Sequence, residues 1–173
     1  GGIDSALTAV LACDALGPEN VTALLMPSMF SSEGSVNDAQ SLAKNLGIEY
    51  EIIPITNVFD TYMQELSPFF KDLPYNVTEE NIQARIRGML LMSFSNKFSH
   101  ILLNTTNKSE MAVGYGTLYG DLCGGLAVLA DVYKTEVYLL SEYVNRHKLR
   151  IPINSTAKPP SAESRPGQKE SDS

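Results

Sequence analysis

The chain opens on Gly1-Gly2-Ile3-Asp4-Ser5, which runs directly into an apolar stretch with helical periodicity. A helix N-terminus presents unpaired N–H groups and a positive dipole, and glycines let a backbone wrap closely around an anion. These residues therefore predict a site for an anion. The structural alternative is a Gly-rich turn in which Asp4 or Ser5 caps a helix.

A second candidate segment is Asn104-Thr105-Thr106-Asn107-Lys108-Ser109-Glu110, which carries a carboxylate and a cation. Mg²⁺ prefers one or two carboxylates together with substrate phosphates, so Glu110 is a candidate ligand and Lys108 could meet a phosphate. The same spacing fits a capping box, in which Asn107 and Glu110 close the start of a helix. Both interpretations stay open on the residues alone.

A third candidate is the polar face formed by Asn81, Arg85 and Gly88, which recur at i, i+4 and i+7 of a predicted helix. A guanidinium fork suits phosphate or carboxylate. The alternative is a solvated face with a small-residue packing contact at Gly88.

The glycines between Gly114 and Gly125 resemble a dinucleotide fingerprint only in part. Their spacing is GxGxxxG instead of GxGxxG, and they follow a predicted helix instead of a strand. The sequence also has no GxxxxGK[ST] motif. A nicotinamide-dinucleotide fingerprint and a Walker A loop are therefore excluded, and the glycines indicate backbone in close approach to a ligand or a neighbouring segment.

Apolar runs alternate with helical patterns along the chain. We predict strands at 21–26, 50–55 and 101–103, and helices at 5–16, 35–46, 57–67, 79–97, 107–113 and 134–148. This alternation favours an α/β fold with a parallel sheet flanked by helices on both faces. Ligands of such folds bind beyond the carboxyl ends of the strands, where the opening loop and residues 104–106 both fall.

Composition narrows the function classes. The 173 residues suit one domain, and the net charge of -7 disfavours non-specific binding to nucleic acid or to anionic membranes. No apolar run approaches the roughly 18 residues of a membrane span. Two cysteines and two distant histidines give neither a disulfide framework nor zinc spacing. No secretory signal is visible, and we expect a cytoplasmic protein.

Five segments together resemble the synthetase domain of the NAD⁺ synthetases, a family of PP-loop ATP-pyrophosphatases. They lie at 1–7, 78–85, 107–115, 117–121 and 158–163, in the family's order. The resemblance implies an adenine nucleotide α-hydrolase-like, Rossmann-like fold. The third and fourth segments are most similar to the glutamine-dependent branch, whose members carry an N-terminal nitrilase-type glutaminase domain.

The resemblance also implies a reaction. ATP adenylates the nicotinate carboxylate of deamido-NAD⁺ and releases pyrophosphate, and ammonia, free or drawn from glutamine, then displaces AMP. The implied catalytic residues are Asp4, Glu110 and Lys134, with Asp4 and Glu110 as Mg²⁺ ligands. The implied ATP contacts come from Gly1, Gly2, Asp4, Ser5, Thr105, Lys134 and Ser161. The implied deamido-NAD⁺ contacts come from Asn81, Arg85, Glu110 and Asp121.

We predict that residues 1–153 form the PP-loop domain, truncated at both ends and without the first strand, which normally feeds the opening loop. Residues 154–173 are polar and are predicted to be a flexible loop or tail. Such a loop would close over the site and exclude water, because an acyl-adenylate hydrolyses. The family implies a homo-oligomer, a dimer or larger. The alternatives are another PP-loop amidotransferase or ligase, and a truncated, non-catalytic nucleotide-binding domain.

Overall fold

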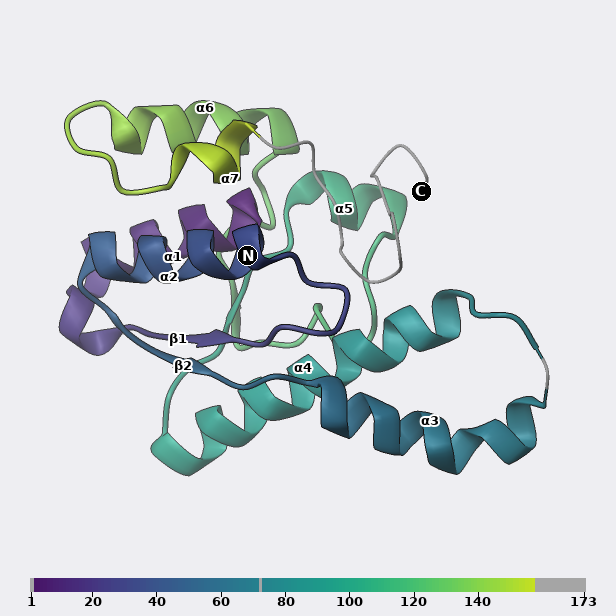
Figure 1. The fold of residues 1–173 in the computed structure, drawn as a ribbon. Helices are drawn as coiled ribbons and strands as arrows, with labels where there is room; N and C mark the ends of the chain where they lie inside the picture. The colour runs from purple at the N-terminus through teal and green to yellow at the C-terminus, as the bar shows by residue number, and fades with distance from the viewer. Residues whose placement is uncertain (1, 72, 158–173) are drawn as a thin grey trace.

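The computed structural model describes residues 2–71 and 73–157, in which helices alternate with short strands. The first half contains α1 (Ile3–Leu16), a 3₁₀ turn (Pro18–Asn20), β1 (Thr22–Leu25), α2 (Glu33–Leu46), β2 (Glu49–Ile52) and α3 (Thr56–Phe70). The second half contains α4 (Val77–Phe98), β3 (Leu103–Asn104), α5 (Lys108–Val113), β4 (Leu126–Ala127), α6 (Lys134–Asn145) and α7 (Ile153–Ala157) (Figure 1).

The strands pair in parallel. Thr22 of β1 lies opposite Glu49 of β2, and Leu103 of β3 lies opposite Leu126 of β4. Parallel neighbours need a crossover connection, and α2 supplies the one between β1 and β2. The predicted α/β class with parallel strands is confirmed. We expected one sheet, whereas the described residues form two sheets of two strands each.

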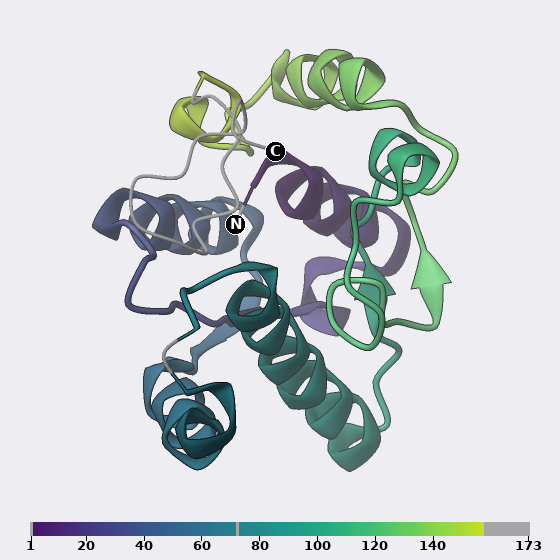
Figure 2. The same cartoon turned by 90° about the vertical axis from the view of Figure 1, so that its right-hand side faces the viewer.

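Helices cover both faces of the β1–β2 pair. On one face, Cys13 of α1, Ala43 of α2 and Ile48 pack together with side chains of both strands. On the other face lies α4, whose Arg87 donates from Nε to the carbonyl of Met26 at 3.0 Å. Figure 1 shows the strands between these layers, and Figure 2 shows α3 beside α4. The predicted flanking of the strands by helices is therefore confirmed.

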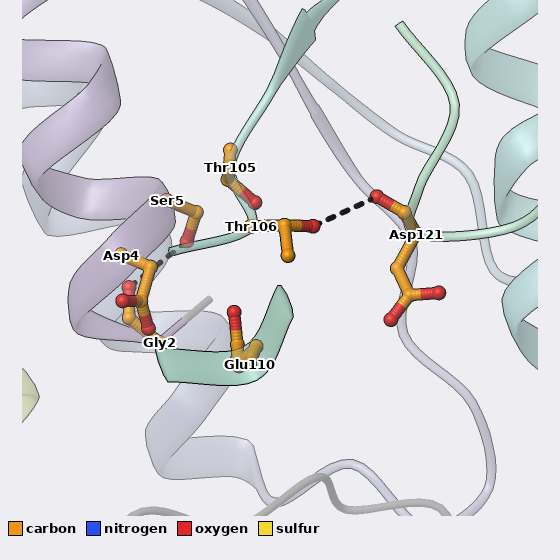
Figure 3. Close-up of a pocket in the computed structure, with 7 residues that line it drawn as sticks. All are labelled: Gly2, Asp4, Ser5, Thr105, Thr106, Glu110 and Asp121. Atoms are coloured by element: carbon orange, nitrogen blue, oxygen red, sulfur yellow. Dashed lines mark hydrogen bonds between the residues drawn. The ribbon is translucent and has the colours of Figure 1, made fainter. Parts of the chain in front are cut away.

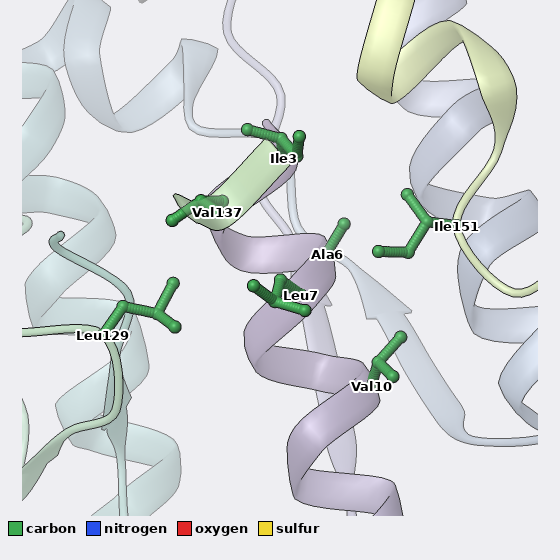
Figure 4. Close-up of a cluster of buried hydrophobic side chains, with 7 residues drawn as sticks. All are labelled: Ile3, Ala6, Leu7, Val10, Leu129, Val137 and Ile151. Atoms are coloured by element: carbon green, nitrogen blue, oxygen red, sulfur yellow. The ribbon is translucent and has the colours of Figure 1, made fainter. Parts of the chain in front are cut away.

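The largest buried cluster fixes α1 in place. Its members from α1 recur at helical spacing and meet side chains from the C-terminal half of the chain (Figure 4). They are Ile3, Ala6, Leu7, Val10, Leu129, Val137 and Ile151. Burying an aliphatic side chain of this size contributes about 1.5–3 kcal/mol. Because the cluster includes Ile3, it also fixes the first turn of α1, where the candidate phosphate site lies.

The longest described helix, α4, begins with a capping box. The Asn76 side chain accepts from the Thr78 N–H, and Glu79 Oε2 accepts from the Asn76 N–H, both at 2.8 Å. The cap is thus Asn76, and the helix begins at Val77, two residues before the predicted start at position 79. Neither this helix nor any other in residues 2–71 and 73–157 is both long and apolar enough to cross a membrane.

The end of α3 differs from the prediction. We expected the helix to stop at Ser67, before Pro68, but it continues to Phe70. A proline inside a helix leaves the carbonyl four residues earlier without its N–H donor. Here that carbonyl belongs to Gln64, and Ser67 Oγ donates to it at 3.1 Å. The serine therefore supplies the hydrogen bond that the proline cannot make.

Two elements were not predicted. Strand β4 has only two residues, and α7 falls largely within the range expected to be a polar loop. Helix α7 packs against α1 and α2, and Asn154 Nδ2 donates to Asp38 Oδ1 at 3.3 Å. The prediction of a loop was therefore wrong for residues 154–157. The remainder of that predicted loop, residues 158–173, lies outside the described residues.

Candidate active site

A cavity of about 140 Å³ opens at the N-terminus of α1. Figure 3 shows its lining residues: Gly2, Asp4, Ser5, Thr105, Thr106, Glu110 and Asp121. They come from the start of α1, the end of β3, the start of α5 and the segment 114–125, called here the Gly-rich segment. Six of the seven were predicted as site residues from the sequence. The fold therefore gathers residues that are far apart along the chain.

The start of α1 is open to a ligand. The helix begins at Ile3, and no side chain caps it within the described residues. Ser5 Oγ instead donates to the carbonyl of Gly2 at 2.9 Å. The alternative in which Asp4 or Ser5 caps this helix is therefore wrong, since both residues lie inside its first turn. First-turn N–H groups without a side-chain cap are suited to an anion.

Both carboxylate oxygens of Asp4 are engaged. Oδ1 accepts from Asn107 Nδ2 at 2.9 Å, and Oδ2 accepts from Lys134 Nζ at 2.6 Å. The side chain of Asp4 is 14% exposed and that of Lys134 is 25% exposed, so the ion pair is largely shielded from water. Lys134 thus lies beside the cavity, although it is not one of the lining residues. Two charges of opposite sign meet at the site.

Glu110 lines the cavity and also closes the capping box of α5. Its Oε2 accepts from the Asn107 N–H at 3.0 Å, while the Asn107 side chain accepts from the Glu110 N–H at 3.0 Å. Burial raises the pKa of Glu110, the backbone hydrogen bond from Asn107 opposes this, and the charge of Asp4 adds to it. The predicted capping box is confirmed, and it is compatible with a place in the cavity.

Asn104 ties the Gly-rich segment to the end of β3. Its Nδ2 donates to the carbonyls of Asp121 at 2.7 Å and Cys123 at 3.2 Å, and its Oδ1 accepts from the Thr106 N–H at 2.8 Å. Thr106 Oγ1 also donates to the Asp121 carbonyl at 3.3 Å (Figure 3). A Cβ on Gly124, where φ is +145°, would lie 3.0 Å from the Asn104 backbone nitrogen. This close approach brings Asp121 to the cavity.

The polar face of α4 contacts the same segment. Asn81 Oδ1 accepts from Thr117 Oγ1 at 2.7 Å, and Arg85 Nε donates to the Leu118 carbonyl at 3.2 Å. A Cβ on Gly88 would lie 2.7 Å from a backbone oxygen of that segment, so the small-residue packing contact is confirmed. Asn81 and Arg85 are therefore held against the Gly-rich segment and are not among the residues that line the cavity.

Some predicted contacts are not seen. Lys108 pairs with Asp131 at 2.7 Å and lies over the Tyr133 ring, away from the cavity lining. Gly1 and Ser161 lie outside the described residues. Sequence reasoning missed Thr106 and the role of Asn107 beside Asp4. Both belong to the run 105–107 that follows β3, and their position at a strand end was the signal that could have identified them.

The residues present fit a magnesium site of a particular kind. Within residues 2–71 and 73–157 no cluster of three or more His, Cys, Asp or Glu side chains could hold a metal alone. Asp4 and Glu110 instead give two carboxylates beside an anion site, the donor set that Mg²⁺ uses when substrate phosphates complete its coordination.

Comparisons with known proteins agree with this geometry. A family model described as NAD synthase matches residues 1–173. The glutamine-dependent NAD(+) synthetase of Synechocystis sp. is 56% identical over 173 residues, which are 100% of this chain and 31% of that protein. The chain thus spans about a third of the length of this curated relative.

Two solved structures are similar to the fold. The glutamine-dependent NAD+ synthetase from Acinetobacter baumannii in complex with ADP has 49% identity and a TM-score of 0.89 over 91% of this chain and 30% of that one. The NMN synthetase from Francisella tularensis has 30% identity and a TM-score of 0.87 over 99% of this chain and 67% of that one.

Proposed function

Because this chain belongs to the NAD synthase family, we propose that the complete protein amidates deamido-NAD⁺ to NAD⁺ with ATP as the second substrate. The observation that carries the proposal is the cavity at the uncapped start of α1, where Asp4 and Glu110 face an anion site. Glutamine or free ammonia supplies the nitrogen. The greater length of the glutamine-dependent relative supports an attached glutaminase domain.

The reaction proceeds in two displacements. An oxygen of the nicotinate carboxylate attacks the α-phosphorus of ATP, the bond to the β-phosphate oxygen breaks, and pyrophosphate leaves. The nitrogen of ammonia then bonds to the acyl carbon, the bond to the adenylate oxygen breaks, and AMP leaves with that oxygen. The nitrogen loses its extra proton to solvent or to a basic group. Adenylation is needed because a carboxylate is itself a poor electrophile.

The chain's own residues bind and orient the phosphates. The N–H groups at the start of α1, including those of Gly2 and Ser5, bind the leaving pyrophosphate, and Lys134 adds a positive charge. Asp4 and Glu110 would hold Mg²⁺, which neutralises charge that develops on the phosphates. Thr105 contacts ATP from the end of β3. Gly1 and Ser161 complete the proposed ATP contacts from outside the described residues.

Deamido-NAD⁺ lies along the Gly-rich segment in this proposal. Asn81 and Arg85 contact that segment from α4, and Asp121 reaches the cavity from within it. Together with Glu110 these residues bind the nicotinate half of the substrate. Glu110 belongs both to the proposed Mg²⁺ and phosphate site and to the proposed deamido-NAD⁺ site. The nicotinate carboxylate of the substrate therefore lies next to the phosphates of ATP.

A second candidate is amidation of nicotinate mononucleotide. The similarity to an NMN synthetase over 99% of this chain favours it. The chemistry at the carboxylate is the same, and only the remainder of the substrate differs. The higher identity to a glutamine-dependent NAD(+) synthetase makes deamido-NAD⁺ the first choice.

A substrate panel tests the proposal. The complete protein is incubated with ATP and Mg²⁺ plus either deamido-NAD⁺ or nicotinate mononucleotide, with ammonium in one series and glutamine in another. Mass spectrometry quantifies the amide product, AMP and pyrophosphate. We expect NAD⁺ and AMP in equal amounts. Product from the mononucleotide alone would favour the second candidate, and intact ATP in every tube would overturn both.

Glu110→Gln tests the site itself. Glutamine keeps the capping box of α5 and removes the charge, so we expect a folded protein whose turnover falls at least about 10²-fold. Glu136→Gln is the matched control, because Glu136 Oε2 accepts from the Tyr133 N–H at 2.9 Å at the start of α6 and Glu136 does not line the cavity. Unchanged turnover of Glu110→Gln at saturating Mg²⁺ would leave Glu110 only its capping role.

A further inference from the structure

Asn107 is a completely buried residue that hydrogen-bonds to two residues of the cavity lining, Asp4 and Glu110. Its Nδ2 donates to Asp4 Oδ1 at 2.9 Å, its Oδ1 accepts from the Glu110 N–H at 3.0 Å, and its own N–H donates to Glu110 Oε2 at 3.0 Å. Because Oδ1 must face a backbone N–H, the amide group can present only Nδ2 to Asp4. The orientation of the side chain is therefore fixed.

We propose that Asn107 is a positioning residue that holds the carboxylates of Asp4 and Glu110 in the arrangement that binds a divalent cation together with nucleotide phosphates. The inference rests on the proposed function, because it assigns a metal-binding role to those two carboxylates. Neither the family resemblance nor the capping of α5 assigns this positioning role to Asn107.

A neutral amide suits this task. Asp4 and Glu110 line one cavity and repel each other when both are ionised, so each needs a fixed partner to stay in place. Asp4 Oδ2 already pairs with the Lys134 ammonium at 2.6 Å, and the Asn107 amide orients the other oxygen, Oδ1, without adding a second positive charge that would compete with a metal ion. Hydrogen-bond partners of metal ligands act in this way, and their loss typically costs about 10–100-fold in metal affinity or activity.

The helix cap alone does not require asparagine. Serine, threonine or aspartate would cap α5 about as well. Among the common caps only asparagine has its acceptor and its donor on two separate atoms: Oδ1 accepts from the Glu110 N–H, and Nδ2 donates to Asp4, 103 positions away in the sequence. Asn76 provides the internal comparison, since it caps α4 in the same Asn-x-x-Glu pattern but is exposed and bonds to Thr78 and Glu79 of its own helix.

The test separates capping from positioning. In the complete protein, Asn107→Ser keeps a cap acceptor on a shorter side chain and loses the Nδ2 amide that donates to Asp4, while Asn76→Ser removes the matching amide from α4. Mn²⁺ binding is titrated in the presence of α,β-methylene-ATP, with free Mn²⁺ followed by its paramagnetic resonance signal. We expect Asn107→Ser to weaken Mn²⁺ binding about 10–100-fold and Asn76→Ser to change it less than about threefold.

Steady-state kinetics provides a second readout. The half-saturating Mg²⁺ concentration of Asn107→Ser should rise by the same factor, and saturating Mg²⁺ should restore kcat to within about threefold of wild type. A merely destabilised protein would not recover in this way. If the serine variant melts earlier than Asn76→Ser, Asn107→Thr, a cap of different shape, carries the same expectations.

The Asp4→Asn variant separates a failure of the proposed metal site from a failure of the proposed role of Asn107. Wild-type Mn²⁺ affinity in Asp4→Asn would overturn the metal site of the proposed function. Loss of Mn²⁺ binding in Asp4→Asn, with near wild-type binding in both Asn107→Ser and Asn107→Thr, would overturn only the positioning role.

Discussion

Asn104→Ala should loosen the candidate site without altering a residue that lines its cavity. Asn104 is 6% exposed, and its side chain makes three hydrogen bonds, two of which hold the Gly-rich segment to β3. When the Asn104 side chain is removed, Thr106 Oγ1 can still donate a hydrogen bond to the carbonyl of Asp121, which lies 3.3 Å away. Two groups lose the partner that Asn104 supplied: the Cys123 carbonyl and the Thr106 N–H.

The expected magnitude follows from these two groups. A buried polar group left without its partner costs about 1–3 kcal/mol, which gives roughly 2–6 kcal/mol for the pair. Water that enters from the adjoining cavity offsets part of this cost, so we expect about 2–4 kcal/mol. Because each 1.4 kcal/mol is a factor of ten, local opening should become at least about 30-fold more frequent.

Hydrogen exchange read by mass spectrometry on the complete protein measures this effect. Amides in residues 114–125 should exchange at least about 30-fold faster in Asn104→Ala than in wild type. The control is Asn96→Ala, at an exposed position on α4. Exchange within about threefold of wild type would refute the reasoning and show that other contacts, such as the Gly125 N–H to the Leu102 carbonyl at 2.8 Å, hold the segment alone.

Three further predictions concern stability. Gly88→Ala should lower the midpoint of thermal unfolding, because the new Cβ would lie 2.7 Å from the Tyr119 carbonyl oxygen. The cost of overpacking, about 1–3 kcal/mol, outweighs the roughly 1 kcal/mol that alanine contributes to helix stability. A raised midpoint in scanning calorimetry would contradict this. Leu7→Ala removes a fully buried side chain and should cost about 2–5 kcal/mol in denaturant titration, so a loss below about 1 kcal/mol would be inconsistent with the packing. Arg150 donates two hydrogen bonds to the Asp14 carboxylate and so holds the pKa of Asp14 below its ordinary value. The ionised carboxylate therefore stabilises the fold at pH values above the unfolded pKa of about 3.9. This contribution disappears as the pH falls through the lowered pKa of the folded protein. The advantage of wild type over Asp14→Asn, no more than about 1 kcal/mol at this exposed pair, should therefore shrink as the pH falls from about 5 through the lowered folded pKa, and an advantage independent of pH would argue against the ion pair.

Local patterns in the sequence predicted the elements that carry the site. The Asn107-x-x-Glu110 capping box is confirmed. It could be predicted because a capping box depends only on two residues three positions apart. The glycine at position 88 packs against the Gly-rich segment as its small size indicated. Repetition of apolar strands and helical patterns was enough for the α/β class, since the alternation itself defines the layers.

Contacts between distant segments could not be predicted in the same way. The hydrogen bond from Asn107 to Asp4 joins residues 103 positions apart, and no local pattern encodes it. Strand β4 has two residues, too few for an alternation of apolar and polar positions to appear. The continuation of α3 through Pro68 depends on one serine hydroxyl that replaces a backbone donor. In each case a specific tertiary or side-chain contact decided the outcome.

The proposed function requires that the substrate carboxylate be activated by adenylation. The most direct test supplies the complete protein with ATP, Mg²⁺, an ammonia source and deamido-NAD⁺ labelled with ¹⁸O in both carboxylate oxygens. Mass spectrometry then locates the label in the products. Transfer of one ¹⁸O to AMP, with the other retained in the amide of NAD⁺, is the predicted result. Label in inorganic phosphate together with ADP, or NAD⁺ formed with unlabelled AMP, would contradict the account.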